Sequence, residues 1–155
     1  MRRQDRKVLQ PEQIDAIIES CDCLRLGLNA EDGAYIVPLN FAYVPGKPAK
    51  FYFHSAKEGR KVDMIGQGAK AGFELDGAHR LGEAETGCRH TFFYQSVIGT
   101  GTVRPVETLE EKKRALSAIM AHYRKDCAFS FTDEQADAVA VFCLTAETMS
   151  CKQHS

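Results

Sequence analysis

The chain has 155 residues, a hydrophobic content of 44% and a formal net charge of −1 at pH 7. This length and composition suit a single domain over residues 1–155 with enough apolar side chain for a sizeable core. The balanced charge argues against a general nucleic-acid-binding protein, and no apolar stretch predicts a secretory signal or a membrane span. We therefore expect a cytoplasmic protein whose six cysteines are reduced.

Two segments near the N-terminus predict a helix and then a strand. Isoleucines recur at helical spacing over 11–21, where Pro11 suits the first helical position. Leucines alternate with other residues over 23–29, which is the period of a strand. Cys21 and Cys23 would then share one face of that strand.

The next segments predict several more strands. Asp32-Gly33 predicts a hairpin turn. Because proline has no backbone N–H, Pro38 indicates that the following strand is at an edge or is irregular at that point. Gly99 and Gly101 predict a bulge, a bend or a close approach within one long strand. The segment 77–90 is expected to be a loop. The strands expected after the hairpin turn cover residues 34–43, 50–54, 70–76, 91–106 and 137–149, the last being apolar and therefore central.

Two capping boxes predict the starts of two further helices. Thr108 and Glu111 precede an amphipathic segment, and Ser55 and Glu58 predict a helix that begins at Ala56. Short turns join most strands, so the sheet should be largely antiparallel. The predicted fold is mostly β, a barrel of about six strands with helices at its rim.

The helix start predicted behind the aromatic run FYF carries unusual positive charge. Lys57, Arg60 and Lys61 surround it, and Gly59 would let another group come close. A helix start offers free N–H groups and a dipole that favours an anion. Two interpretations stay open: a phosphate site or a solvated, lysine-rich turn. His54, just before the turn, is either structural or a neighbour of the ligand.

No metal site is predicted. Cys88 and His90, with His79 nearby, fit no zinc spacing, and a fourth ligand is not evident.

Three blocks, YIVPLNFAY, FYFHSAKEGRKVDMI and YQSVIGTG, follow one another along the chain. In this order and spacing they resemble the FMN-binding split barrel of the pyridoxamine 5′-phosphate oxidase-like superfamily, and within it the nitroimidazole-resistance branch. The resemblance covers nearly the whole chain. It implies a six-stranded, largely antiparallel split β-barrel, a homodimer, and FMN held at the subunit interface.

The resemblance also implies which residues hold the FMN. A strand would run along the isoalloxazine ring and hydrogen-bond its polar edge through backbone groups: Ile36, Val37, Pro38, Leu39 and Asn40. The same wall would continue through Phe53, His54 and Ser55. The phosphate would be held by Lys57, Arg60 and Lys61, with Gly59 allowing its approach. Contacts from the long strand of the other subunit would come from Tyr94, Gln95 and Ser96.

The implied activity is that of an FMN-dependent oxidoreductase. The flavin would carry hydride or electrons from a reduced nicotinamide to a small electron-poor acceptor such as a nitroimidazole, and His54 would donate a proton or orient the substrate. No GxGxxG fingerprint is present, so NAD(P)H would bind transiently over the flavin. The tail CKQHS lacks the arginine with which true pyridoxamine oxidases bind their substrate, which argues against oxidation of pyridoxamine phosphate.

Two alternatives come from other classes of protein. One is a flavin- or haem-binding module without turnover, with His54, His90 or His122 as an axial ligand. The other is a nucleotide-binding regulator that uses the same phosphate-binding turn.

Overall fold

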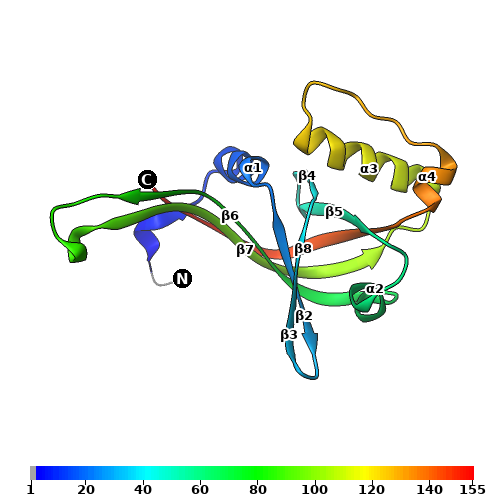
Figure 1. The fold of residues 1–155 in the computed structure, drawn as a ribbon, viewed down its shortest axis with the longest axis horizontal. Coiled ribbons are helices and arrows are strands. Elements are labelled where there is room, and N and C mark those ends of the chain that lie inside the picture. The colour runs from blue at the N-terminus through cyan, green and yellow to red at the C-terminus, as the bar shows by residue number, and fades with distance from the viewer. Residues whose placement is uncertain (1–2) are drawn as a thin grey trace.

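The computed structural model describes residues 3–155 and is built around one antiparallel sheet (Figure 1). The sheet has eight strands in the order β3-β2-β6-β7-β8-β5-β4, and the short β1 pairs with β8. The strands are β1 (Lys7–Val8), β2 (Leu24–Ala30), β3 (Gly33–Leu39), β4 (Ala42–Val44), β5 (Lys50–Ser55), β6 (Ala69–Gly82), β7 (Thr91–Pro105) and β8 (Ala140–His154). The helices are α1 (Pro11–Ser20), α2 (Arg60–Ile65), α3 (Leu109–Tyr123) and α4 (Asp133–Asp137), with 3-10 turns η1 (Gln4–Arg6) and η2 (Gly87–Arg89).

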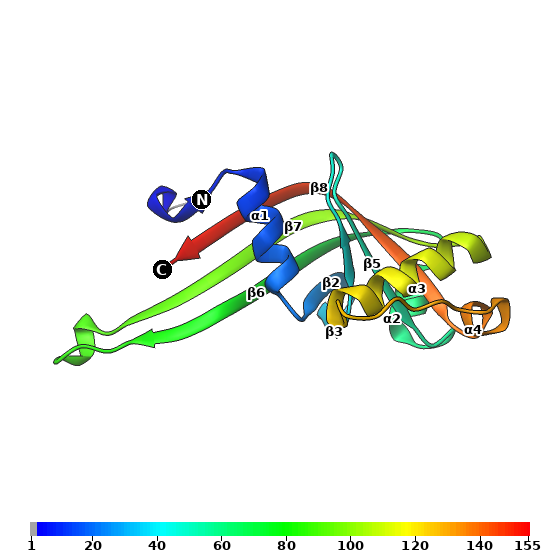
Figure 2. The ribbon, with the colours of Figure 1, turned by 90° about the horizontal axis from the view of Figure 1, so that it is seen from above.

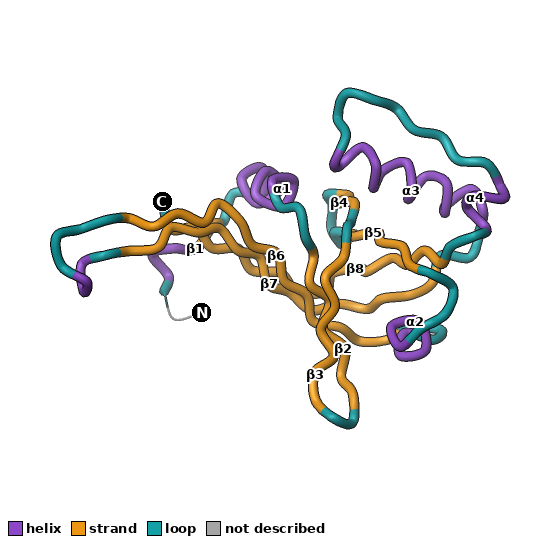
Figure 3. Tube along the Cα trace, viewed as in Figure 1, coloured by secondary structure: helices purple, strands orange, loops and turns teal. Residues whose placement is uncertain are grey.

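Three long strands, β6, β7 and β8, run side by side through the molecule (Figure 2). Beyond the body, β6 and β7 continue as a projecting hairpin, which we call the arm, and β2 and β3 form a second hairpin at the sheet edge (Figure 3). Helix α1 contacts β6 and β7, whereas α3 contacts β4 and β5. The two ends of the described chain meet because β1 pairs with the end of β8.

The core lies inside the curved sheet and is rich in aromatic rings. Phe41, Phe51 and Phe53 are fully buried, and the Phe51 ring lies 5.1 Å from that of Phe73. A smaller apolar cluster joins α3 and α4 to β8 through residues such as Leu116. The predicted fold class, a mostly β, antiparallel split barrel with flanking helices, is confirmed.

Several local predictions are also confirmed. Helix α1 begins at Pro11, and Thr108 caps α3 by accepting a hydrogen bond from the Glu111 N–H at 3.3 Å. The hairpin turn ends at Gly33, whose φ of +126° suits glycine. Pro38 lies in β3, an edge strand that pairs only with β2.

The long β7 has an irregular register just beyond Gly99, as its glycines predicted. A Cβ on Gly99 would collide with the Phe73 ring and with the Thr148 carbonyl oxygen. Glycine is therefore required at this position by the close approach of the neighbouring strands.

Three predictions about the strands are wrong. The sheet has eight strands instead of six, because β1 and β4 are short strands that the hydrophobic pattern did not separate. Strand β6 continues to Gly82, so only residues 83–90 of the expected loop 77–90 connect β6 to β7, and they contain the turn η2. A bulge near Ala78, with φ +53°, lets β6 follow β7. Cys21 and Cys23 do not share a strand, since Cys21 is the C-cap of α1 and Cys23 lies before β2.

The predicted capping box at Ser55 is also wrong. The Ser55 hydroxyl donates to the Ala56 carbonyl at 2.7 Å, and the helix begins only at Arg60. Its N-cap is Gly59, with φ +125°, which is a conformation that few other residues adopt and that separates the turn from the helix. Glu58 therefore lies in the turn and does not cap α2.

Candidate functional site

The turn between β5 and α2 keeps its positive charge in the folded chain, although the helix starts later than expected. Arg60 forms an ion pair with Asp32 of the β2–β3 turn at 2.6 Å, and its guanidinium lies 4.9 Å from the centre of the Tyr35 ring. Lys57 pairs with Asp137 of α4 at 3.2 Å. Within residues 3–155, Lys61 has no ion-pair partner, and partial burial lowers the pKa of its ammonium group.

The space over this turn is open. A Cβ on Gly59 would meet no atom within 4 Å, so a ligand could approach the backbone there. Helix α2 has only six residues, and its dipole is correspondingly small. The lysine and arginine side chains, more than the helix, would attract an anion.

His54 lies directly before this turn, at the surface of β5, opposite Val141 of β8. Partial burial lowers the pKa of its ring, and the nearby charge of Lys61 lowers it further. The folded-state pKa is thus below the ordinary value of 6.5, so His54 is neutral at pH 7 with one N–H donor and one nitrogen acceptor.

The predicted ring-binding strand is the edge strand β3. Ile36 and Pro38 point outward, whereas Leu39 is buried and Val37 is half-buried. Among the described residues 3–155, β3 pairs with β2 alone, so its other edge offers backbone N–H and C=O groups to a ligand. Asn40 follows the strand at the surface.

Phe53 and Ser55 differ in which of their groups could contact a ligand. The Phe53 side chain is fully buried and stacks on Phe142 at 5.4 Å, so only its backbone could contact a ligand. Ser55 is half-buried at the end of β5.

One side of β3, β2, β6 and β7 contains exposed and half-buried residues. Cross-strand partners point to the same side, which places these residues together. We call this surface the open face; it contains Arg25, Gly27, Ile36, Pro38, Gly72, Glu74, Ile98 and Thr100.

The open face contains an apolar groove of about 450 Å³. Gly27 and Gly72 line it, as do Ile36 and Ile98, which are 63% and 56% exposed. Arg25 of β2 forms ion pairs with Glu74 at 3.0 Å and with Asp76 at 2.6 Å, both of β6, and so links these two strands on the open face.

The remaining predicted contacts are not brought to the turn within one chain. Tyr94 pairs with His154 at one end of β8, and His54 pairs with Val141 at the other. These positions are thirteen residues apart along β8, or roughly 40 Å at about 3.3 Å per residue. Gln95 and Ser96 pair with Gln153 and Lys152, twelve and eleven residues from Val141, so they too lie far from the turn.

Sequence reasoning missed the residues that hold Arg60. Asp32 and Tyr35 belong to a hairpin far along the chain, and only the tertiary fold sets them beside the turn. It also missed that an arginine does reach the C-terminal tail: Arg6 lies beside Tyr94 and His154.

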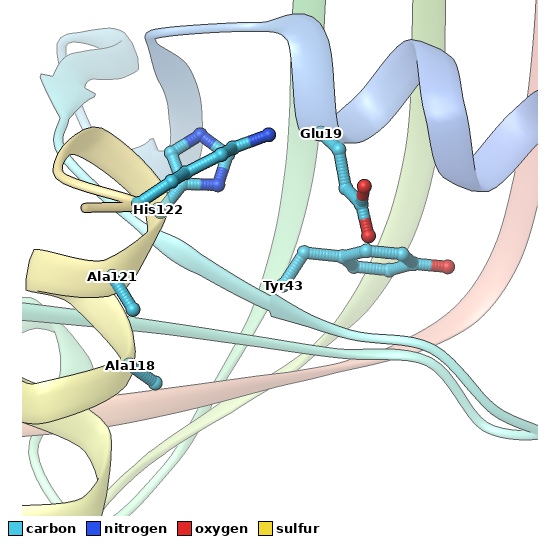
Figure 4. A pocket seen from close by; sticks show the side chains of 6 residues that line it. Glu19, Tyr43, Ala118, Ala121 and His122 are labelled. Atoms are coloured by element: carbon cyan, nitrogen blue, oxygen red, sulfur yellow. The ribbon is translucent and has the colours of Figure 1, made fainter. Parts of the chain in front are cut away.

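A second cavity, of about 480 Å³, lies away from these residues, between α1 and the end of α3 (Figure 4). Figure 4 shows the Glu19 carboxylate above the Tyr43 ring, with His122 across the space. The His122 Nε2 lies 2.8 Å from the Cys21 carbonyl oxygen, and its ring lies 4.4 Å from that of Phe41. These contacts give His122 a structural role.

Three further features bear on the class of protein. Among residues 3–155, no group of three or more His, Cys, Asp or Glu side chains is placed to hold a metal ion. No helix in this range is long and apolar enough to cross a membrane. All six cysteines are free thiols.

Comparison with known proteins shows the family. Residues 10–153 match the model of the pyridoxamine 5′-phosphate oxidase family, so the chain belongs to that family. A candidate 5-nitroimidazole antibiotic resistance protein from Bacteroides thetaiotaomicron is similar in sequence and fold, with 30% identity and a TM-score of 0.80. The match covers 95% of this chain and 86% of that one.

More distant structures share the fold. The FAD and heme binding protein from Mycobacterium smegmatis has 15% identity and a TM-score of 0.81, covering 97% of this chain and 74% of that one. A FAD-binding protein from Mesorhizobium loti has 16% identity and a TM-score of 0.64, covering 95% and 96%. No curated protein sequence matches the chain.

Proposed function

We propose that the protein is an FMN-dependent oxidoreductase that acts on a small electron-poor acceptor. The observation that carries this proposal is the cationic turn of Lys57, Arg60 and Lys61 beside the neutral His54. A protein with 30% identity is described as a candidate 5-nitroimidazole antibiotic resistance protein, and a more distant structure is described as FAD-binding.

The residues present fit a flavin phosphate. Arg60 and Asp32 are 51% and 71% exposed, and Lys57 and Asp137 are 51% and 66% exposed, so both ion pairs are exposed and weak. A phosphate could replace either carboxylate at little cost. The open space at Gly59 and the unpaired, partly desolvated Lys61 fit the same ligand.

We propose a homodimer with FMN at the subunit interface. Within one chain, Tyr94, Gln95 and Ser96 lie too far from the turn to contact the same flavin. A twofold partner could bring its own Tyr94 region to the turn, and the exposed Ile36 and Ile98 of the open face suit burial against a second copy.

The bound flavin would supply the redox chemistry, accepting hydride from a reduced nicotinamide and passing it to the acceptor. The chain would position it: β3 through the free edge of its backbone, and the turn through charge. His54 would orient the acceptor through hydrogen bonds from its N–H and to its free ring nitrogen, since its lowered pKa leaves the ring neutral at pH 7. A neutral ring favours this orienting role over the donation of a proton. A cytoplasmic location is expected from the six free thiols.

The test is an absorption spectrum of the purified protein, followed by anaerobic addition of NADH or NADPH. We expect a flavin band that bleaches on reduction and returns when a nitroimidazole is added. A flavin band that never bleaches would support a binding module, and a Soret band would support haem. Colourless protein that takes up no added FMN would refute the proposal.

A further inference from the structure

The cavity of about 480 Å³ between α1 and the end of α3 shares no residue with the flavin turn or the open face. We call it the α1–α3 cavity; it is lined by Glu19, Tyr43, Ala118, Ala121, His122 and Lys125. Its volume is in the range of sites that hold small molecules. None of these residues has a part in the proposed flavin site, so a ligand bound here would be a second one.

The walls of the α1–α3 cavity are largely held in place. The Tyr43 ring packs against the core, and its hydroxyl donates to the Asp15 carboxylate at 2.6 Å. His122 lies across the space and is held by its hydrogen bond to the end of α1 (Figure 4). Ala118 and Ala121 of α3 have small side chains and therefore leave the space open.

Glu19 brings a negative charge to a place where α1 does not balance it. It lies in the last turn of α1, where the helix dipole disfavours a carboxylate, and α1 contains no lysine or arginine. Asp15, one turn earlier, adds a like charge, which destabilises a helix further. Within residues 3–155 Glu19 forms no ion pair. This end of the α1–α3 cavity therefore attracts a cation.

Lys125 brings a positive charge from the other side. It follows the C-cap of α3, and the adjacent carboxylate of Asp126 is held by Arg124 at 2.9 and 3.1 Å. Among the described residues Lys125 has no ion-pair partner, and although it lines the same cavity as Glu19, the two do not pair. Two opposite charges with an open space between them suit a ligand that carries both charges.

We propose that the α1–α3 cavity binds a small zwitterion, a molecule with an ammonium group and a carboxylate such as an amino acid. The ammonium group would lie by the Glu19 carboxylate, which Figure 4 shows above the Tyr43 ring, and an aromatic ring face also attracts a cation. The carboxylate would bind Lys125. The apolar body of the ligand would pack against the Tyr43 ring and the two alanines.

The test is a titration of the full-length protein, without added flavin, with L-phenylalanine and with 6-aminohexanoate. Binding is followed by NMR of the tyrosine ring signals, and the Tyr43 signal is assigned by its loss in Tyr43→Phe. We expect this signal to move and to saturate. Tighter binding of either probe supports the site, and the difference shows whether the two charges of the ligand are close together or far apart.

Matched ligands test whether both charges are recognised. Phenethylamine and 3-phenylpropionate each keep one charge of L-phenylalanine, and hexylamine and hexanoate each keep one charge of 6-aminohexanoate. Each should bind more weakly than its zwitterion, by roughly fivefold if the lost contact is an exposed ion pair. If an amine or an acid binds as tightly as its zwitterion, the proposal is wrong.

Matched variants test which residues form the site. Glu19→Gln and Lys125→Gln should each weaken binding roughly fivefold, whereas Glu12→Gln, at the start of the same helix, should leave it unchanged. Ala121→Leu should block binding by filling the space, and Ala16→Leu, at an exposed residue of α1 outside the cavity, should not.

The thermal midpoint of each variant shows that it is folded. Equal effects of Glu19→Gln and Glu12→Gln, or a Tyr43 signal that moves with neither zwitterion, would overturn the proposal. Because no flavin is added, these results stand even if the protein binds no FMN.

Discussion

The affinity for FMN should depend on Arg60. Because Arg60 forms an ion pair with Asp32, substitutions at these two residues should change the affinity in opposite directions. Removing the guanidinium with Arg60→Ala takes away a contact to the phosphate but also ends the existing pair at 2.6 Å. Replacing the carboxylate with Asp32→Asn has the opposite effect, because it releases Arg60 for the ligand. Asparagine before Gly33 also suits a hairpin turn, so the hairpin should be retained.

The two effects differ in size. A hydrogen bond to a charged group contributes about 1.5–3 kcal/mol, whereas an exposed ion pair contributes about 0.2–1 kcal/mol. Since about 1.4 kcal/mol is a factor of ten in affinity, Arg60→Ala should raise the Kd for FMN roughly tenfold. Asp32→Asn should lower it by up to about fivefold. Arg60→Ala combined with Lys61→Ala should weaken binding by tenfold or more.

The assay is the quenching of FMN fluorescence on titration with protein from which flavin has been removed. Asp32→Asn is measured both with Arg60 and in the Arg60→Ala background, where its benefit should disappear. If Arg60→Ala leaves the Kd within about twofold of the wild type, or if Asp32→Asn weakens binding, Arg60 does not hold the phosphate.

Other outcomes follow from the same structure. Burial lowers the pKa of Lys61, and a bound phosphate would raise it again. The affinity for FMN should therefore fall as the pH rises through the lowered pKa, where Lys61 loses its charge. Lys61→Arg keeps the charge and should flatten this part of the pH profile. Ile98→Glu should turn a dimer into a monomer in analytical ultracentrifugation, while Leu9→Glu, at a residue 67% exposed, should leave the dimer intact. Gly99→Ala should lower the stability to urea by about 1–3 kcal/mol or prevent folding, whereas Gly72→Ala, which meets only a distant carbonyl oxygen, should fold normally.

The two hairpins show which features of a strand pair can be predicted from a local sequence pattern. Asp32-Gly33 predicted the β2–β3 turn correctly, since turn geometry depends on a few adjacent residues. Residues 77–90 were expected to be a loop, but residues 77–82 belong to β6 and pair with β7 as far as Gly82, and only the rest connects the two strands. Such pairing depends on the partner strand, which a local pattern does not describe.

The phosphate turn shows the same division. The positive charge of Lys57, Arg60 and Lys61 is readable from the sequence. The place where α2 begins was predicted wrongly. The Ser55 hydroxyl bonds to the Ala56 carbonyl and does not cap a helix, and the helix begins only after Gly59. The sequence thus shows which positive side chains could hold a phosphate, whereas the fold decides where these side chains lie relative to α2.

By itself, the sequence determined the order of most strands and helices and the family to which the chain belongs, and it limited Pro38 to an edge strand or an irregular point. These depend on spacing and residue type within short segments. The tertiary structure alone decided that Asp32 holds Arg60, that the Tyr94 region lies far from the turn, and that Arg6 meets the C-terminal tail. Each of these joins segments distant in the chain, and their meeting depends on the register and curvature of a sheet that no single segment specifies.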